Sequence, residues 1–186
     1  MDLNLPEPVS TSSNDNSVQG LVDMVLSSYQ RYYNIQTDCH ILGTNLTALA
    51  RFHSRGEKYV MVKSAKLWAI ECNEYVMVMV VPKFDEEQAR EAFSLLERAE
   101  AEFVKPHSEH MYTHLSIIII ASHLHSDALK QVKRHKFRKN YRFTLHGWSN
   151  GRIAVINAQD MSCYANRDGK EIAKFLEKKF RAGSIR

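Results

Sequence analysis

The hydrophobic residues of this chain follow two kinds of pattern, and together they predict a sheet flanked by helices. Residues Leu115–Ala121 are apolar at almost every position, which is typical of a strand covered on both faces. We therefore expect this strand to lie at the centre of a sheet. Ligands of such sheets gather where central strands end, so the two ends of this strand are the first places to search for a site.

Helices are predicted where apolar residues recur three and four positions apart. Such stripes run through Ser17–Tyr33, through residues 85–105 and through the segment that follows Gly169. The second of these begins with Asp85 and a capping-box residue three positions later, and it ends at Lys105-Pro106. A shorter helix is expected from Ser126 to about His135.

Three strands are predicted between the first two helices, at Leu46–His53, Lys58–Glu71 and Tyr75–Val81. Turns at Arg55–Glu57 and Cys72–Asn73 would join them into a meander.

Three further strands are predicted after the short helix. Arg138–His146 alternates apolar and polar side chains, as a half-buried strand does. Asn150-Gly151 is typical of a hairpin turn, with Ile153–Ile156 as the returning strand. Ser162–Ala165 is expected to add a short edge strand.

The predicted fold is a single α/β (α+β) domain with the element order α-βββ-α-β-α-βββ-α. Its sheet is mixed and mostly antiparallel, has six to seven strands and is covered by helices on both faces. The domain is expected over residues 17–182, between a disordered tail at 1–16, which is rich in Pro, Ser and Asn, and a C-terminal tail at 183–186. The pattern leaves strand order and oligomeric state open.

The composition is that of an ordinary globular domain, with 44% hydrophobic and 25% charged residues in 186. The three cysteines are scattered and form no CxxC pair, which argues against a disulfide framework or a zinc ribbon. No apolar run approaches the roughly 18 residues of a membrane span, and the N-terminus has no signal-peptide pattern. We expect a cytoplasmic protein without membrane association.

The positive charge is concentrated in one run, residues 130–142, which contains seven Lys and Arg residues and no acid. Without these seven the formal charge of +4 would become −3. Phe137 and Tyr141 are interleaved with the cations, a mixture that suits phosphate contacts and base stacking. Alternatively, the cations only complement a helix dipole or protect an edge strand from pairing. The predicted polyanion-binding residues are Lys130, Lys133, Arg134, Lys136, Arg138, Lys139 and Arg142.

Histidines precede the central strand and could bind a divalent metal ion together with a neighbouring acid. The candidate ligands are His107, Glu109, His110 and His114. Their spacing matches no specific ligand motif, and Pro106 argues against a helix that would align them. The alternative is that they are polar loop residues held by hydrogen bonds near the sheet. No other cofactor is indicated.

The order helix, three strands, helix, strand resembles the core of restriction-endonuclease-like nucleases. That resemblance implies an acid on the second strand and a Glu-x-Lys motif on the third, which bind a metal ion and help to activate water. Here Glu71-Cys72-Asn73 and Glu74-Tyr75-Val76 both lack the lysine, and no Pro-Asp motif precedes them. No catalytic residue can therefore be assigned. The alternative is that the two acids flank a turn and face water.

Several short phrases resemble a small bacterial family of uncharacterised proteins. They are Lys66-Leu67-Trp68-Ala69, Asn73-Glu74-Tyr75, His107-Ser108-Glu109-His110-Met111-Tyr112 and His146-Gly147-Trp148. The resemblance spans most of the chain after the tail and implies a bacterial cytoplasmic protein. It implies no activity, cofactor or partner.

The sequence contains no GxGxxG, Walker, GxSxG or HExxH motif, so no motif assigns an activity. The leading hypothesis is a non-enzymatic module that binds a polyanion, either nucleic acid or a phosphorylated partner, through the basic run. One alternative is a metal-dependent hydrolase or degenerate nuclease. The other is a protein-interaction domain without a ligand, whose basic face only keeps it soluble.

Overall fold

The computed structural model describes residues 12–58 and 68–183. The helices are α1 (Ser12–Ser27), α2 (Glu86–Phe103), α3 (Ser126–Arg134) and α4 (Lys170–Gly183). The strands are β1 (Asn34–Ile41), β2 (Thr44–Lys58), β3 (Trp68–Phe84), β4 (His110–Leu124), β5 (Arg138–Asn140), β6 (Trp148–Asn157) and β7 (Cys163–Ala165). The predicted element order is confirmed. Residues 1–11 of the predicted tail and 184–186 of the C-terminal tail lie outside the described residues.

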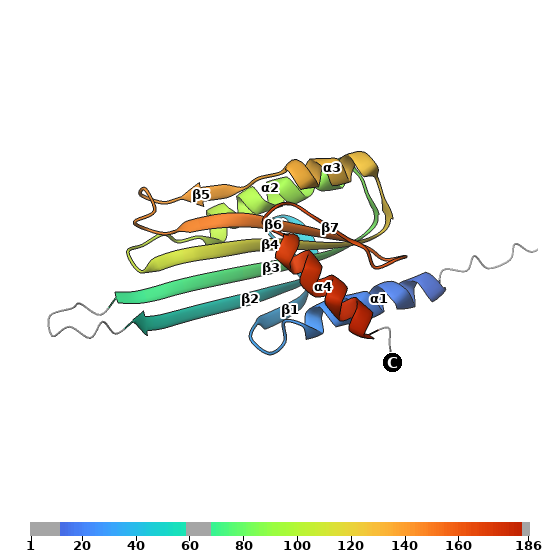
Figure 1. The fold of residues 1–186 in the computed structure, drawn as a ribbon, viewed down its shortest axis with the longest axis horizontal. Coiled ribbons are helices and arrows are strands. Elements are labelled where there is room, and N and C mark those ends of the chain that lie inside the picture. Colours follow the sequence, from blue (N-terminus) through green and yellow to red (C-terminus); the bar gives the residue numbers. More distant parts are fainter. Residues whose placement is uncertain (1–11, 59–67, 184–186) are drawn as a thin grey trace, which may run out of the picture.

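The seven strands form one mixed sheet in the order β1-β2-β3-β4-β6-β5 (Figure 1). The three long inner strands β3, β4 and β6 are parallel, and the other pairs are antiparallel. β5 and β7 share the outer edge of β6, where β5 pairs with its first residues and β7 with residues 154–156. The predicted mixed sheet is therefore confirmed, with β4 at its centre.

β4 is central because its middle part, residues Leu115–Ala121, is buried throughout and apolar at all positions but Ser116. Leu115, Ile117 and Ile119 pack into the hydrophobic cluster beneath α2 and α3. Ile118 and Ile120 point to the opposite face and pack into the cluster beneath α1 and α4. Burying each such side chain contributes about 1.5–3 kcal/mol, so a strand with both faces apolar is stable only between two helical layers.

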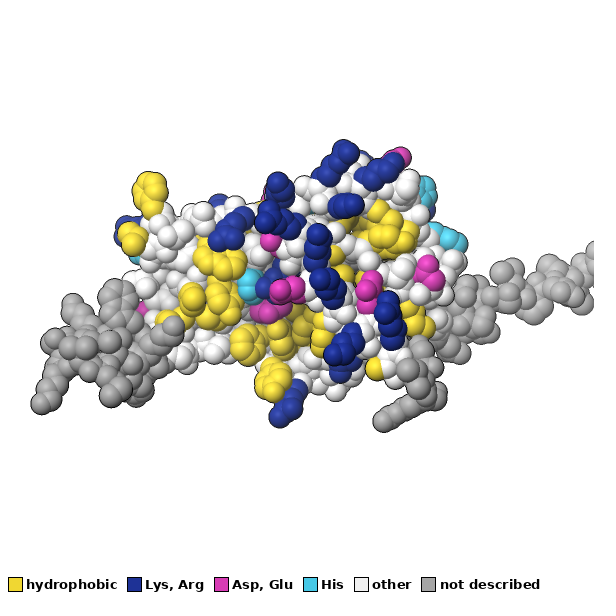
Figure 2. Space-filling view, in the orientation of Figure 1, with side chains coloured by type: hydrophobic (Ala, Val, Ile, Leu, Met, Phe, Trp, Pro, Cys, Tyr) yellow, Lys and Arg dark blue, Asp and Glu magenta, His cyan; other side chains and the backbone are white. Residues whose placement is uncertain are grey.

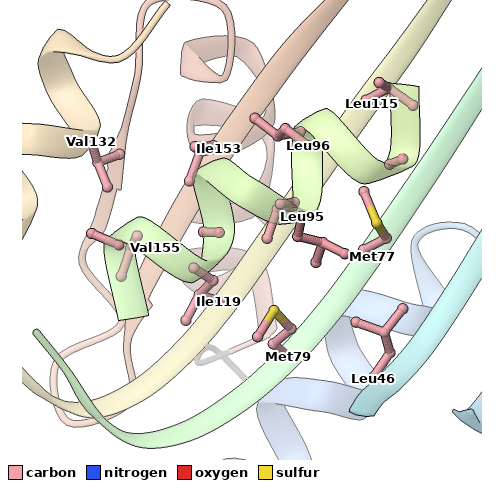
Figure 3. Close-up of a cluster of buried hydrophobic side chains, with 14 of the residues drawn as sticks. Leu46, Met77, Met79, Leu95, Leu96, Leu115, Ile119, Val132, Ile153 and Val155 are labelled. Carbon is pink, nitrogen blue, oxygen red and sulfur yellow. The ribbon is translucent and has the colours of Figure 1, made fainter. Parts of the chain in front are cut away.

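Helix α2 supplies most of one layer. Asp85 caps it by accepting hydrogen bonds from the backbone N–H groups of Glu87 and Gln88. Its buried stripe includes Leu95 and Leu96, which lie among side chains from β2, β3, β4 and β6 (Figure 3). The predicted start and apolar face of this helix are both confirmed.

The meander before α2 has three strands, as predicted, but in different places. β1 lies before the first predicted strand, and β2 continues through the turn predicted at 55–57. The turn predicted at Cys72–Asn73 is wrong, because both residues lie inside β3 and pair with Ser54 and His53 of β2. Asn73 hydrogen bonds across the strands to His53, so its polar amide fits a buried strand position. Most of the predicted strand at Lys58–Glu71 falls on residues 59–67, outside the described part.

The second half of the chain contains two further corrections. The strand predicted at Arg138–His146 ends at Asn140, and the turn that follows has left-handed backbone at residues 142–144 and exposes Phe143 at 99%. The hairpin predicted at Asn150-Gly151 is wrong, because both residues are buried inside β6. Gly151 is needed there for space: an added Cβ would lie 2.6 Å from Leu96 Cδ1 and 2.9 Å from Phe137 Cβ.

Helices α1 and α4 cover only part of their face of the sheet. They lie over the carboxyl-terminal parts of β3, β4 and β6, and no described helix covers the amino-terminal parts of these strands on that face (Figure 1). The side chains on this open area come from alternate residues of the three strands. Those of β4 and β6 are aromatic or polar; they are Tyr112, His114, Trp148 and Asn150.

Candidate polyanion-binding surface

A groove of about 500 Å³ runs between α3 and α4 above β7. Its walls include four lysines, Lys130 and Lys133 from α3 and Lys170 and Lys174 from α4. Leu129 contributes to its apolar part, and Glu177 also lines it. We call this feature the lysine groove. Lys and Arg side chains form a broad band over α3 and α4 in the space-filling view (Figure 2).

A second hollow, of about 620 Å³, adjoins the lysine groove and shares Leu129 and Tyr164 with it. It lies where the parallel strands end, and its lining includes Lys83 near the end of β3, His123 near the end of β4 and Asn157 at the end of β6. The carboxyl ends of parallel strands are where α/β sheets usually bind ligands. The ends of the central strand are the first places where the sequence suggests searching for a site, and this hollow lies at one of them.

The seven predicted basic residues do not all have the same surroundings. Lys130 forms an ion pair with Asp127 at 2.8 Å, and Lys139 forms one with Glu100 at 2.7 Å. Arg138 lies over the indole ring of a tryptophan on β6. The other four are exposed, and no described acid forms an ion pair with them; they are Lys133, Arg134, Lys136 and Arg142. These four and Arg138 are available to an anion.

The open area of the sheet holds the rings of Tyr112, His114 and Trp148 and the guanidinium group of Arg138. We call this cluster the sheet platform. Tyr112 and His114 are alternate residues of β4, and Trp148 pairs with Tyr112 across the parallel ladder. The ring centroids of Tyr112 and Trp148 are 5.5 Å apart, and His114 lies 4.6 Å from the first and 5.3 Å from the second. The guanidinium carbon of Arg138 is 4.4 Å from the Trp148 centroid, which is cation–π distance.

A row of polar side chains separates the sheet platform from the helices. Arg152 of β6 pairs with Glu74 of β3 at 3.4 Å, and Ser116 of β4 donates a hydrogen bond to the same carboxylate. The side chains of Glu74 and Arg152 are only 16% and 18% exposed. Tyr33 also hydrogen bonds to Glu74, and burial together with this carboxylate raises the pKa of the Tyr33 phenol. The row is thus a compensated, largely buried network.

His114 belongs to both the platform and this row. Its Nδ1–H donates to Asn150 Oδ1 at 2.6 Å, which fixes the ring beside the two aromatic residues. Burial lowers the pKa of His114, and the nearby Arg152 guanidinium acts in the same direction. The imidazole is therefore neutral at physiological pH.

The predicted histidine ligands are not brought together. His107 accepts from the Glu109 backbone N–H through Nδ1 and therefore donates through Nε2 to Glu71. His110 is buried between the His146 carbonyl and the Thr113 hydroxyl, Glu109 pairs with Arg55 at 2.6 Å, and His114 lies on the platform. Among the residues that the structure describes, no three His, Cys, Asp or Glu side chains form a group suited to a metal ion.

The two acids of the nuclease comparison point to opposite faces of β3. Glu71 accepts hydrogen bonds from Asn73 and His107, and this hydrogen bonding lowers its pKa. Glu74 is on the other face, with Arg152. The strand alternation that separates them prevents them from sharing one ion.

The sequence pattern identified the basic residues on the α3 side of this surface. It missed the lysines of α4 and the sheet platform. The lysines of α4 recur four positions apart, at 170 and 174, and this spacing is the signal that places them on one helix face. The platform could have been suspected from Tyr112 and His114, which alternate along a strand, but Trp148 joins them only through the β4–β6 register.

A family model for a domain of unknown function, DUF8052, matches residues 17–178. The chain belongs to the DUF8052 family. Membership of an uncharacterised family, which the sequence resemblance implied, is thus confirmed. The matched range includes the lysine groove and the platform. No curated protein and no solved structure matches the chain. Among the described helices of this DUF8052 domain, none has the length and apolar character to cross a membrane.

Proposed function

We propose that this DUF8052 domain binds nucleic acid through the lysine groove and the basic residues beside it. The observation that supports the proposal most is that lysines from α3 and α4, far apart in the sequence, line the same groove. Lys133, Lys170 and Lys174 form no ion pair with a described acid. Cations gathered on one face attract a polyanion, because binding releases the counterions condensed on its phosphates.

The affinity of such a complex must fall steeply with salt. Each phosphate contact contributes about 0.9 to the slope of log K against log salt concentration for duplex DNA, and about 0.7 for a single strand. The double variant Lys133→Gln/Lys174→Gln removes one cation from each wall of the groove. We expect it to reduce the slope by about 1.5–2 and to weaken binding at low salt.

A matched control removes the same charge elsewhere. Arg90 and Lys105 are exposed residues on and just after α2, outside the groove. Fluorescence anisotropy with labelled DNA and RNA should give Arg90→Gln/Lys105→Gln the wild-type slope. Equal losses in both double variants would mean that only net charge matters and would contradict the assignment to the groove. Binding of a phosphorylated peptide in preference to both nucleic acids would contradict it as well.

A further inference from the structure

The sheet platform has features that charge alone does not require. Tyr112 and Trp148 are partly exposed on a sheet face where no described helix covers them, although aromatic side chains are usually buried in a sheet of this kind. Their rings lie side by side on neighbouring strands, within 5.5 Å of each other. In the space-filling view, a hydrophobic patch lies over this part of the sheet, next to Lys and Arg side chains (Figure 2).

The platform is ordered by contacts on the sheet itself. His114 is fixed by its hydrogen bond to Asn150 and packs at an edge-to-face angle of 65° against Trp148. Arg138 is held over the same indole. A preformed aromatic surface costs a ligand little ordering entropy on binding, so these contacts favour recognition over simple filling of space.

Charge complementarity identifies the ligand class. Arg138 is on the platform and has no ion pair with a described acid, while Glu74 nearby is compensated by Arg152. Asn166 hydrogen bonds to Gly151 and Ile153 of β6, which places the segment that leads into α4, and with it Lys170, beside the strand that carries Trp148. An anion in the lysine groove could therefore continue from Lys170 onto the aromatic rings.

From this arrangement we propose that the platform binds the bases of single-stranded nucleic acid, with Tyr112 and Trp148 as stacking surfaces and Arg138 as a flanking cation. The inference rests on the proposed function and deepens it by naming the substrate class. A duplex offers phosphates but hides the faces of its bases, whereas an unpaired strand can present both to one protein surface. Sheets with exposed aromatic residues recognise single strands in this way.

The intrinsic fluorescence of Trp148 gives a direct test. The chain has two tryptophans, so Trp68→Phe leaves Trp148 as the reporter. Oligothymidylate and oligouridylate of about 12 nucleotides match the footprint of single-strand sites. We expect both to quench Trp148, because a stacked base contacts the indole directly, and we expect a blunt hairpin duplex to bind with little quenching.

Affinity measurements on the otherwise unchanged protein give a second readout. Trp148→Leu should weaken single-strand binding by about tenfold, the loss of roughly one stacked base, and Trp148→Phe should restore most of it. Duplex affinity and its salt slope should change little. Tyr32→Ala is the matched control, since Tyr32 is a highly exposed aromatic residue that follows α1 and has no ring contact with a platform residue among the described residues.

The outcomes separate this inference from the proposed function. Salt-dependent binding that is equal for duplex and single strand, without quenching and without an effect of Trp148→Leu, would overturn the platform and retain the groove. Absence of nucleic-acid binding even at low salt would overturn both. Preference for a phosphopeptide over single strands would also overturn the platform assignment. Unequal affinity for oligothymidylate and oligouridylate, with quenching by the stronger ligand, would support it and show which of the two strands is preferred.

Discussion

Asn166 connects the two halves of the lysine groove through one buried amide. Its Oδ1 accepts hydrogen bonds from Ile153 N at 3.0 Å and from Gly169 N at 2.8 Å. Its Nδ2 donates to the Gly151 carbonyl at 2.9 Å and to the His135 carbonyl at 3.4 Å. The side chain thereby continues the β6–β7 ladder past the end of β7 and holds the start of α4 and the end of α3 against the sheet.

The cost of removing this amide can be worked out bond by bond. Asn166→Ala deletes three hydrogen bonds of 3.0 Å or less and one longer one. Each of the short bonds contributes about 1 kcal/mol, and the Ile153 N–H and Gly151 carbonyl lose a buried partner, which costs more than loss of a bond in water. We expect the free energy of unfolding to fall by about 3–4 kcal/mol.

Two further variants make the test specific. Asn166→Asp keeps both accepted hydrogen bonds, but at neutral pH its second carboxylate oxygen would face the Gly151 and His135 carbonyls in a fully buried site, so its loss should be at least as large as that of Asn166→Ala. Asn157→Ala is the control, because Asn157 Oδ1 accepts a single bond, from the exposed Gln159 N–H at 3.0 Å; we expect about 0.5–1 kcal/mol. Urea denaturation followed by circular dichroism gives all three values. A loss for Asn166→Ala no larger than for Asn157→Ala would refute the reasoning.

Other predictions concern pH, packing and backbone. Burial lowers the folded-state pKa of His114 below 6.5, so its contribution to stability should be complete above about pH 6.5 and should be lost as the pH falls below that value. The urea midpoint of the wild-type protein should therefore fall between pH 7 and pH 5, and the fall should be smaller in His114→Gln. Leu96→Ala should lower the unfolding free energy by about 2–5 kcal/mol, because Leu96 is fully buried. Gly151→Ala should lower the unfolding free energy by about 1–3 kcal/mol, because the added Cβ would contact Leu96. Gly20→Ala, in open space on α1, should raise it by about 0.5–1 kcal/mol, and thermal melts of the two variants compare these effects.

The fold was predictable where hydrophobic pattern alone decides the structure. The nearly continuous apolar run at Leu115–Ala121 predicted a strand covered on both sides, and the apolar stripe after Asp85 predicted a helix facing a sheet. Both inferences rest on burial, which is the largest favourable contribution to folding. They were enough to give the element order.

The predicted turns failed where tertiary contacts override local preference. Asn150-Gly151 has the composition of a hairpin turn, yet Asn150 bonds to His114 and Gly151 leaves room for Leu96. Asn73 suggested a turn but bonds to His53 across two strands. In each case a residue distant in sequence uses the small or polar side chain, and no local pattern contains that information.

The candidate site was predictable only as a set of separate signals. The basic run at 130–142 was visible because its charges are consecutive, and the structure divides them among α3, β5 and the turn that follows. The lysines of α4 were less visible because acids alternate with them along the sequence, and only helix geometry places Lys170 and Lys174 on the face toward α3.

The sheet platform shows why register matters more than composition for this surface. The parallel alignment of β4 with β6 sets Tyr112 opposite Trp148 and His114 opposite Asn150, so four residues from two distant segments become neighbours. A shift of one residue would turn Trp148 toward α2 and leave the histidine without its acceptor. Register is fixed by the buried isoleucines further along the same strands, where Ile118 and Ile120 pack beneath α1 and α4. The hydrophobic core at one end of the sheet therefore determines the arrangement of the aromatic rings at the other.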